Sequence, residues 1–220
     1  MPKEEIMASI EKTLDSLKKN KMAAYYAETR EEAKKLALSL IEKGAVCASG
    51  GSVTLAETGI IDALKNGNYT YIDRMLPELT QEQREEAMRA AFSADVYLSS
   101  ANAITEDGEL YNVDGNSNRV AALLYGAKSV VIVAGINKLV KDLDEAVLRV
   151  KTIAAPKNAK RLSCDTPCAK LGHCISLAKN GGMTNGCKTP GRICANFTVM
   201  AYQRHVSRVK VIIVGETLGY

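Results

Sequence analysis

The sequence contains no tryptophan and only two phenylalanines, so aliphatic side chains and alanine have to fill its core. It also lacks any apolar run near the roughly 18 residues that a membrane-spanning helix needs. Its first residues, Met-Pro-Lys-Glu-Glu, contain none of the apolar segment found in secretory signal peptides. These absences predict a cytoplasmic protein that does not cross a membrane.

A strong excess of charge of either sign is absent as well. The net charge is +4, and the 29 Lys and Arg residues are spread along the chain, so we expect no nucleic-acid partner. A hydrophobic content of 46% and a charged content of 25% are typical of globular proteins. With 220 residues, the chain can form one substantial core, either alone or with a small appendage.

The N-terminal segment predicts an amphipathic helix over residues 3–20, because Ile6, Ile10, Leu14 and Leu17 recur at helical spacing. We therefore expect residues 1–22 to form an N-terminal helix and residues 23–220 to form the main domain. The helix either packs on that domain or binds a partner, and a homodimer would be one use of such a helix.

Over the rest of the chain, short apolar segments alternate with helical patterns. The strand-like segments are residues 45–48, 95–100, 129–134 and 209–214. Continuous apolar runs of this kind are typical of strands buried on both faces. The pattern predicts a single α/β domain with a mostly parallel central sheet flanked by helices. Residues 106–109 should close a hairpin between residues 101–104 and 110–113.

A polar loop, here called the asparagine loop, follows one predicted strand and enters a short helix. It contains Asp114, Gly115, Asn116, Ser117, Asn118 and Arg119. These residue types form turns and cap helices, and backbone N–H groups at a helix start favour an anion. Arg119 adds a positive charge suited to a carboxylate or phosphate. The plainer interpretation is an ordinary turn with a helix cap.

A second polar loop, the glycine loop, runs from Gly50 through Gly51 and Ser52 to Thr54. Glycines permit close backbone approach to an anion, and the two hydroxyls add donors. The loop lacks the spacings of a Rossmann site or a P-loop. Thr54-x-x-Glu57 also fits a capping box, which would make Glu57 structural. We expect the two loops to face each other at the carboxyl ends of the sheet strands, with Arg119 dominating carboxylate affinity.

Five of the six cysteines fall between Cys164 and Cys194, in a region broken by glycine and proline that we expect to be a loop. A cytosolic chain should not rely on disulfides, and thiolates select zinc or iron. The sequence therefore predicts a zinc or iron–sulfur site, with a redox-active set or structural cysteines as alternatives. The four predicted ligands are Cys168, Cys174, Cys187 and Cys194, and Cys164 could replace one of them. The spacing contains no C-x-x-C pair, so it is not that of a zinc ribbon.

Several motifs occur together in one order along the chain. They are Gly50-Gly51-Ser52-Val53-Thr54-Leu55, the segment 101–108, Asp114-Gly115-Asn116-Ser117-Asn118-Arg119-Val120, Val133-Ala134-Gly135-Ile136-Asn137-Lys138, the cysteine segment ending in Thr189-Pro190-Gly191-Arg192-Ile193-Cys194, and the closing segment 211–219. Taken together, this set resembles the LUD-domain (lactate-utilisation) proteins over nearly the whole chain after about residue 20. The chain is similar to a stand-alone LUD domain, with the cysteine-rich loop 164–194 inserted before the last strand.

The resemblance implies a fold similar to that of CoA-transferases and ribose-5-phosphate isomerase, whose glycine-rich loops hold phosphate, carboxylate or CoA groups. It implies binding of a small carboxylate or phosphate metabolite, and a part in lactate or other hydroxy-acid utilisation within an oxidoreductase complex that includes iron–sulfur partner subunits. Glu57 or Asp114 would then serve as general base. The alternatives are a ligand-sensing or metal-binding module without turnover, and a sugar-phosphate isomerase or CoA-transferase-like enzyme with Glu57 as nucleophile.

Two features depart from the family. The interval between Cys174 and Cys187 is longer than in similar tails, which bears on the ligand geometry. The chain also has no ferredoxin-type cluster motif, so it does not resemble the larger iron–sulfur subunit.

Overall fold

The computed structural model describes residues 3–179 and 181–220, and its centre is a six-stranded parallel sheet. The strand order is β1-β10-β7-β4-β2-β3. The strands are β1 (Ala23–Ala27), β2 (Val46–Ser49), β3 (Thr70–Ile72), β4 (Val96–Ser99), β7 (Ser129–Gly135) and β10 (Val209–Val214). The four strands expected from apolar runs all lie in this sheet. The prediction of a single α/β domain with a mostly parallel central sheet is confirmed.

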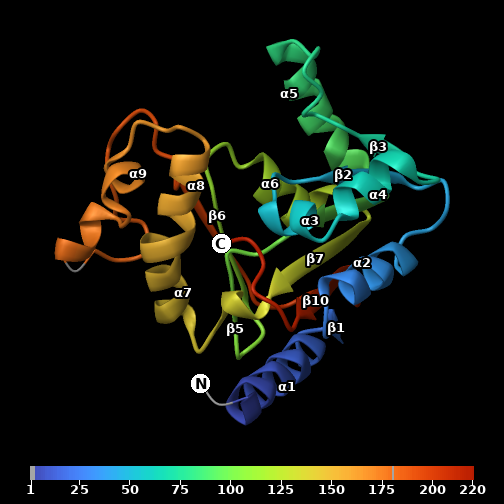
Figure 1. Ribbon diagram of the computed structural model, residues 1–220, viewed down its shortest axis with the longest axis horizontal. Coiled ribbons are helices and arrows are strands. Elements are labelled where there is room, and N and C mark those ends of the chain that lie inside the picture. Colours follow the sequence, from blue (N-terminus) through green and yellow to red (C-terminus); the bar gives the residue numbers. More distant parts are fainter. Residues whose placement is uncertain (1–2, 180) are drawn as a thin grey trace.

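The central strands bury both faces, so successive side chains enter two different cores. Val131 and Val133 pack in one core with helices α2 (Arg30–Ser39), α3 (Val53–Glu57) and α4 (Ile60–Asn66). Val130 and Ile132 pack in the other, with α1 (Lys3–Lys19). Figure 1 shows α2, α3 and α4 together on one side of the molecule.

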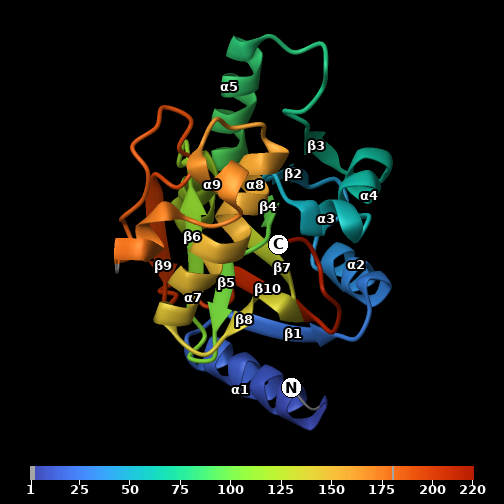
Figure 2. The ribbon, with the colours of Figure 1, turned by 60° about the vertical axis from the view of Figure 1, so that its left-hand side comes forward.

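A second sheet of four strands packs on the α1 side of the central sheet. Its order is β8-β5-β6-β9, and its strands are β5 (Ala103–Thr105), β6 (Leu110–Asp114), β8 (Leu139–Val140) and β9 (Asn196–Met200). β5 and β6 are antiparallel, as the predicted hairpin requires. Ile104 and Leu110 belong to the core shared with the central sheet. Tyr111 points to the other face, which α7 (Leu143–Arg149) covers (Figure 2).

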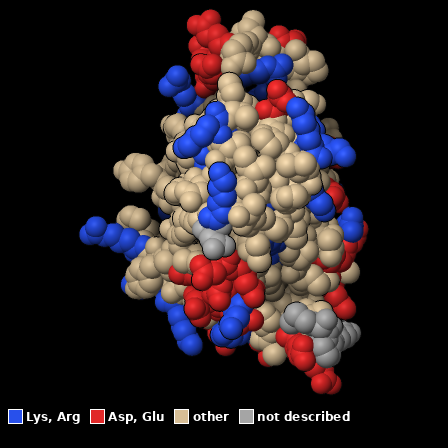
Figure 3. Space-filling view, turned by 90° about the vertical axis from the view of Figure 1, so that its left-hand side faces the viewer, with Lys and Arg blue, Asp and Glu red and all other residues tan. Residues whose placement is uncertain are grey.

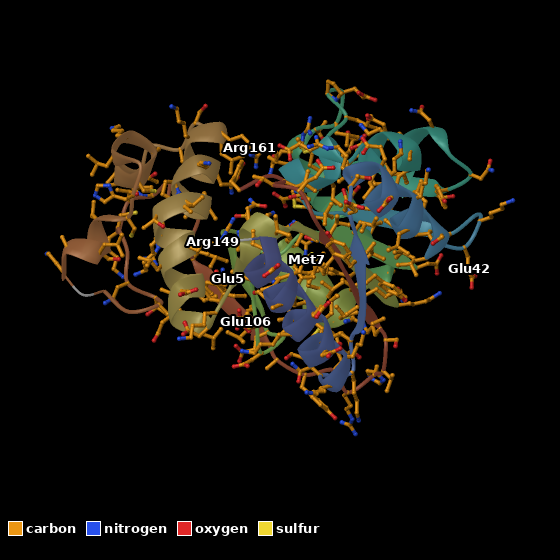
Figure 4. All side chains as sticks on the ribbon, turned by 60° about the horizontal axis from the view of Figure 1, so that its bottom comes forward. Glu5, Met7, Glu42, Glu106, Arg149 and Arg161 are labelled. Atoms are coloured by element: carbon orange, nitrogen blue, oxygen red, sulfur yellow. The ribbon has the colours of Figure 1, made fainter. Side chains whose placement is uncertain are left out.

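Helix α1 is held against the hairpin between β5 and β6. Ile10 and Leu17 are buried, so the chain itself covers much of the apolar stripe of α1. Glu106, at the hairpin turn, accepts hydrogen bonds from Ser9 Oγ and Lys12 Nζ, each at 2.8 Å. Figure 4 shows Glu106 beside the part of α1 that carries Glu5 and Met7. The N-terminal helix therefore packs on the main domain.

The helix after β2 begins at a different cap from the one that the sequence indicated. Ser52 is the N-cap of α3, and its Oγ accepts the backbone N–H of Leu55 at 3.2 Å. The predicted Thr54 capping box is wrong, because Thr54 lies inside α3 with its hydroxyl buried. Helix α3 is followed closely by Gly59, whose φ of +65° is left-handed, and α4 begins after it. Helix α5 (Gln81–Ala90) has a capping box at Thr80 and projects from the body (Figures 1 and 2).

The cysteine-rich region is partly helical, contrary to the expectation of a loop. A π-helical turn at residues 150–154 joins α7 to α8 (Ala155–Arg161). Helix α9 (Pro167–Leu171) follows, capped by Thr166, and it contains Cys168. β9 lies between the cysteines and β10. On the α7–α9 side, Lys and Arg are interspersed with Asp and Glu around a broad uncharged area (Figure 3). Within the described residues, no helix has the length and apolar character needed to cross a bilayer.

Candidate functional site

A main pocket of about 470 Å³ opens at the carboxyl ends of the parallel strands. Both predicted loops line it, the glycine loop after β2 and the asparagine loop after β6. They also touch each other. A Cβ built on Gly50 would come within 2.9 Å of Arg119 Cδ and 3.0 Å of Arg119 Cγ, so only glycine lets the two loops approach this closely.

The predicted binding residues fall into three groups. Those that line the main pocket are Gly51, Ser52, Thr54, Asp114, Gly115, Asn116, Asn118 and Arg119. Gly50 lies behind them against Arg119, and Ser117 adopts a left-handed φ of +66° at the entry to α6 (Asn118–Ala121). Glu57 lies on the exposed surface outside the lining, where Oε2 accepts the backbone N–H of Gly219 at 2.7 Å. Its position suits a structural role for its carboxylate.

Nearly all the N–H groups of the Arg119 side chain donate hydrogen bonds within the protein. Nη1 donates to Asn112 Oδ1 at 2.7 Å and to the Ser100 carbonyl, and Nη2 donates to Asn102 Oδ1 and to the Val113 carbonyl at 2.8 Å. Nε lies 3.6 Å from Asp114 Oδ2. Burial lowers the pKa of the guanidinium, and Asp114 partly opposes that shift. The hydrogen bonds of Arg119 thus tie the asparagine loop to the segment after β4, while its aliphatic part packs against Gly50 of the glycine loop.

Lys138, which the sequence analysis assigned no role, forms the base of the pocket. It is the last residue of the short 3-10 turn Ile136–Lys138 that follows β7, and it is only 3% exposed. Its Nζ donates to Thr54 Oγ1 at 2.8 Å and to Ser100 Oγ at 2.9 Å. Burial, helped by the charges of Arg149 and Arg119, lowers the pKa of Lys138 to about 7. The only sequence signal was its place at the end of a buried strand, inside one of the motifs shared with the LUD family.

Arg149 on α7 fixes the ends of two elements around Lys138. Its Nε donates to the Asn137 carbonyl at 2.8 Å and its Nη1 to the Asn102 carbonyl at 2.6 Å. Burial lowers its pKa to about 10. In Figure 4, Arg149 and Arg161 both lie on the side of α7 and α8 that faces the centre of the molecule. Helices from the far side of the second sheet thus supply charge to the pocket.

Cations predominate in the pocket lining. The positively charged residues are Arg74, Arg119, Lys138, Arg161 and Arg192, and Asp114 is the one carboxylate among the described lining residues. Arg161 donates to Asn158 and to the Tyr220 hydroxyl, and Arg192 donates to three backbone carbonyls. Within the part of the chain that the structure describes, no hydrogen bond or ion pair engages the guanidinium of Arg74. Its Nη2 lies 3.3 Å from where a Cβ on Gly51 would be.

A second, smaller cavity of about 20 Å³ lies between the second sheet, the turn before α8 and the cysteine segment. We call it the thiol cavity, because all four predicted ligands, Cys168, Cys174, Cys187 and Cys194, line it. Cys164 does not. Among residues 3–179 and 181–220, no three His, Cys, Asp or Glu side chains are already placed to hold a metal ion. Metal binding at these cysteines stays a prediction.

Comparison with known proteins places the chain in a family. The LUD domain family model matches residues 10–214. No curated protein matches the chain. Among solved structures, a DUF162 family protein from Deinococcus radiodurans aligns with a TM-score of 0.50 and 14% identity, over 97% of this chain and 99% of that one. At this identity the likeness shows the fold alone. Because the family model spans most of the sequence, the chain belongs to the LUD domain family.

Proposed function

We propose that the protein binds a small organic anion, a carboxylate or phosphate metabolite, in the main pocket. The observation that carries this proposal is the lining, in which five cations face one carboxylate around a space of about 470 Å³. That volume lies in the range of small-molecule sites. A cleft lined by charges of one sign also raises the local concentration of ligands of the opposite sign.

Arg74 and Lys138 are the groups that would contact the anion. Arg74 has an unused planar guanidinium, suited to bidentate contact with a carboxylate or phosphate. Lys138 uses two N–H groups on Thr54 and Ser100, and when it is protonated it has a third for the ligand. Arg119 would act through the loops that it positions, because its own donors are engaged. Arg74 therefore replaces Arg119 as the arginine that we propose contacts the negative charge of the ligand.

A second candidate function, proton transfer, is favoured by Lys138. With a pKa of about 7, its amine is partly neutral at physiological pH, as a general base must be. Such a base could take the hydroxyl proton of a lactate-like hydroxy acid, or a proton next to a carbonyl in an isomerase reaction. In hydroxy-acid oxidation the Cα–H bond breaks as well, and that hydrogen would leave with both electrons as a hydride, which a redox cofactor on a partner subunit would have to accept. A ligand-sensing module without turnover needs only the binding step.

The test uses lactate, pyruvate, glycerate, ribose 5-phosphate and inorganic phosphate as probes, at pH 6.5. We expect at least one to raise the melting temperature, because a ligand that binds only the native state stabilises it. Titration calorimetry on Arg74→Gln should then show affinity reduced by about 10- to 150-fold, the loss of one hydrogen bond to a charged group. Arg204→Gln, an exposed substitution outside the lining, is the matched control.

Two results would contradict the proposal. One is that no carboxylate or phosphate among the probes shifts the melting temperature and that native mass spectrometry of the purified protein finds no bound small anion. The other is that a probe binds Arg74→Gln and Lys138→Met as tightly as the unmodified protein. Proton abstraction next to a carbonyl is tested separately by deuterium exchange into the carbon-bound positions of pyruvate and ribose 5-phosphate, which Lys138→Met should abolish.

A further inference from the structure

The thiol cavity brings together cysteines from four separate places. Cys168 lies in α9, Cys174 follows that helix, and Cys187 and Cys194 flank the turn at Pro190. Cys174 and Cys187 are each only 9% exposed. The other two cysteines lie elsewhere: Cys47 is in the core of the central sheet, and Cys164 is outside the cavity lining. Four of the six thiols therefore line the same cavity.

Three of these thiols have a hydroxyl neighbour two residues away. The Sγ–Oγ distances are 3.4 Å for Cys168 with Thr166, 3.3 Å for Cys174 with Ser176 and 3.4 Å for Cys187 with Thr189. Next to Cys194 the corresponding position is Arg192, which donates Nε to the Cys194 carbonyl and Nη1 to the Cys187 carbonyl. In metal sites, hydrogen-bond donors around the ligand atoms hold the ligands in orientation, and hydroxyls next to cysteine sulfurs could do so here.

Two buried polar groups also border the cavity. Tyr111 is fully buried and lines the cavity, and within the described residues its hydroxyl has no hydrogen-bond partner. An unpaired buried hydroxyl is costly, so a group within the cavity that accepts its proton is to be expected. Lys151, 5% exposed, donates Nζ to Ser176 Oγ and to the carbonyls of Gly181, Gly182 and Asn185. It thereby ties the loop before Cys187 to the neighbour of Cys174.

We propose that the four cysteines bind one thiophilic metal ion, zinc, as thiolates. Four thiolates and one divalent ion carry a net charge of −2. Lys151 brings a positive charge to the cavity lining, and Arg192 brings another to the backbone of Cys187 and Cys194 from outside the lining. The thiolates of Cys168 and Cys187 would accept hydrogen bonds from the hydroxyls of Thr166 and Thr189, and one of the four thiolates would accept a hydrogen bond from the Tyr111 hydroxyl. This site is independent of the anion proposed for the main pocket.

The size of the cavity favours a single ion over a cluster. A space of about 20 Å³ holds one water-sized species. An iron–sulfur cluster brings its own sulfide ions and would push the surrounding segments apart. A zinc ion instead draws the sulfurs inward to about 2.3 Å from the metal. Cys174, Cys187 and Cys194 lie outside regular helices and strands, so their segments can make that movement.

The experiment is a titration of the reduced, metal-free full-length chain with Co(II), followed by its displacement with Zn(II). We expect one ion per chain, with the thiolate charge-transfer absorption of a tetrahedral four-sulfur site, and tighter binding of zinc. Cys187→Ser should weaken Co(II) binding by at least 100-fold. Cys164→Ser, a cysteine of the same segment outside the cavity, should leave it unchanged. Thr189→Val, which removes one outer hydroxyl, should weaken it by about 10- to 100-fold.

Thiol labelling of the unmodified chain decides the question even where a variant fails to fold. Bound Zn(II) should protect Cys168, Cys174, Cys187 and Cys194 from iodoacetamide and leave Cys164 reactive. The proposal is overturned by sub-stoichiometric Co(II) binding, by equal effects of Cys164→Ser and Cys187→Ser, or by labelling that zinc does not change. Protein purified without oxygen that contains iron and equal inorganic sulfide would overturn the single-ion assignment.

Discussion

Lys138 provides the sharpest physical test of the main pocket, because its charge is buried without a carboxylate partner. Its Nζ contacts are two hydroxyls, and the charges that act on it most strongly are the cations Arg149 and Arg119. Substituting methionine keeps the length and most of the volume of the side chain while removing the amine. We expect Lys138→Met to stabilise the protein at low pH, and to do so less as the pH rises.

The magnitude follows from the lowered pKa of Lys138. The unfolded lysine has its ordinary pKa of 10.5 and the folded one about 7, a difference of 10.5 − 7 = 3.5 units. Between these values the unfolded state binds more protons, so the free energy of unfolding rises with pH by about 1.4 kcal/mol per unit. Below pH 7 the full penalty of about 5 kcal/mol applies, and above pH 10.5 none remains. From pH 6 to pH 9 the free energy of unfolding of the unmodified protein therefore rises by about 2.7 kcal/mol, and the methionine variant has no such rise.

The assay is urea unfolding of both proteins at pH 6, 7.5 and 9, followed by circular dichroism. The gain in unfolding free energy from Lys138→Met should shrink by about 2–3 kcal/mol between pH 6 and pH 9. Losing the partner of Thr54 and Ser100 costs the same at each pH, so it cancels from this difference. Lys141→Met, at an exposed lysine three residues on, is the control and should show no such change. A gain that is the same at pH 6 and pH 9 would refute the reasoning.

Three further outcomes are expected. Arg119→Ala should lower the unfolding free energy by about 3–5 kcal/mol in urea titrations, because it leaves Asp114 and four neutral acceptors without their buried partner, whereas Arg74→Gln should leave stability nearly unchanged. Affinity for whichever anion binds should fall as the pH rises through about 7, because Lys138 then loses the proton that attracts the anion; calorimetry in buffers of different ionisation enthalpy should show proton uptake on binding. Tyr111→Phe should raise the melting temperature of the metal-free chain, since it removes an unpaired buried hydroxyl worth about 1–3 kcal/mol, and should weaken Co(II) binding.

The central sheet could be predicted because its strands leave a plain signature. A strand covered on both faces must be apolar at every position, as in Ser129–Gly135. Edge strands of the second sheet carry no such run. In β9 only Met200 is buried and the other residues are half-buried or exposed, and β8 has only two residues, so neither strand was expected. The position of the glycine loop followed from the central sheet, because parallel strands end on the same side. The asparagine loop follows β6 of the second sheet, so its place at the pocket depends on how the two sheets pack.

The roles of individual side chains depended on contacts that no local pattern contains. Arg119 was the only cation within either loop, which suggested a ligand clamp. Its donors are in fact taken by Asn112 and Val113 of β6 and by Ser100 and Asn102 between β4 and β5. Conversely, little in the sequence marks Lys138, and its amine is buried because α3 and the segment after β4 pack around it. The similarity to the CoA-transferase and isomerase fold group remains a prediction from the resemblance.

The thiol cavity and the main pocket share one stretch of chain, and this sharing has a physical consequence. Pro190, Gly191, Arg192 and Ile193 line the main pocket, and Cys187 and Cys194 on either side of them line the thiol cavity. Arg192 ties the two walls together through the carbonyls of both cysteines. A Cβ on Gly115 of the asparagine loop would lie 3.4 Å from the Ile193 carbonyl oxygen, so a shift of this stretch reaches the pocket by direct contact. If the proposed metal ion draws Cys187 and Cys194 inward, it would also set the position of this wall of the main pocket. Metal occupancy would then be coupled to anion affinity without any movement of the central sheet.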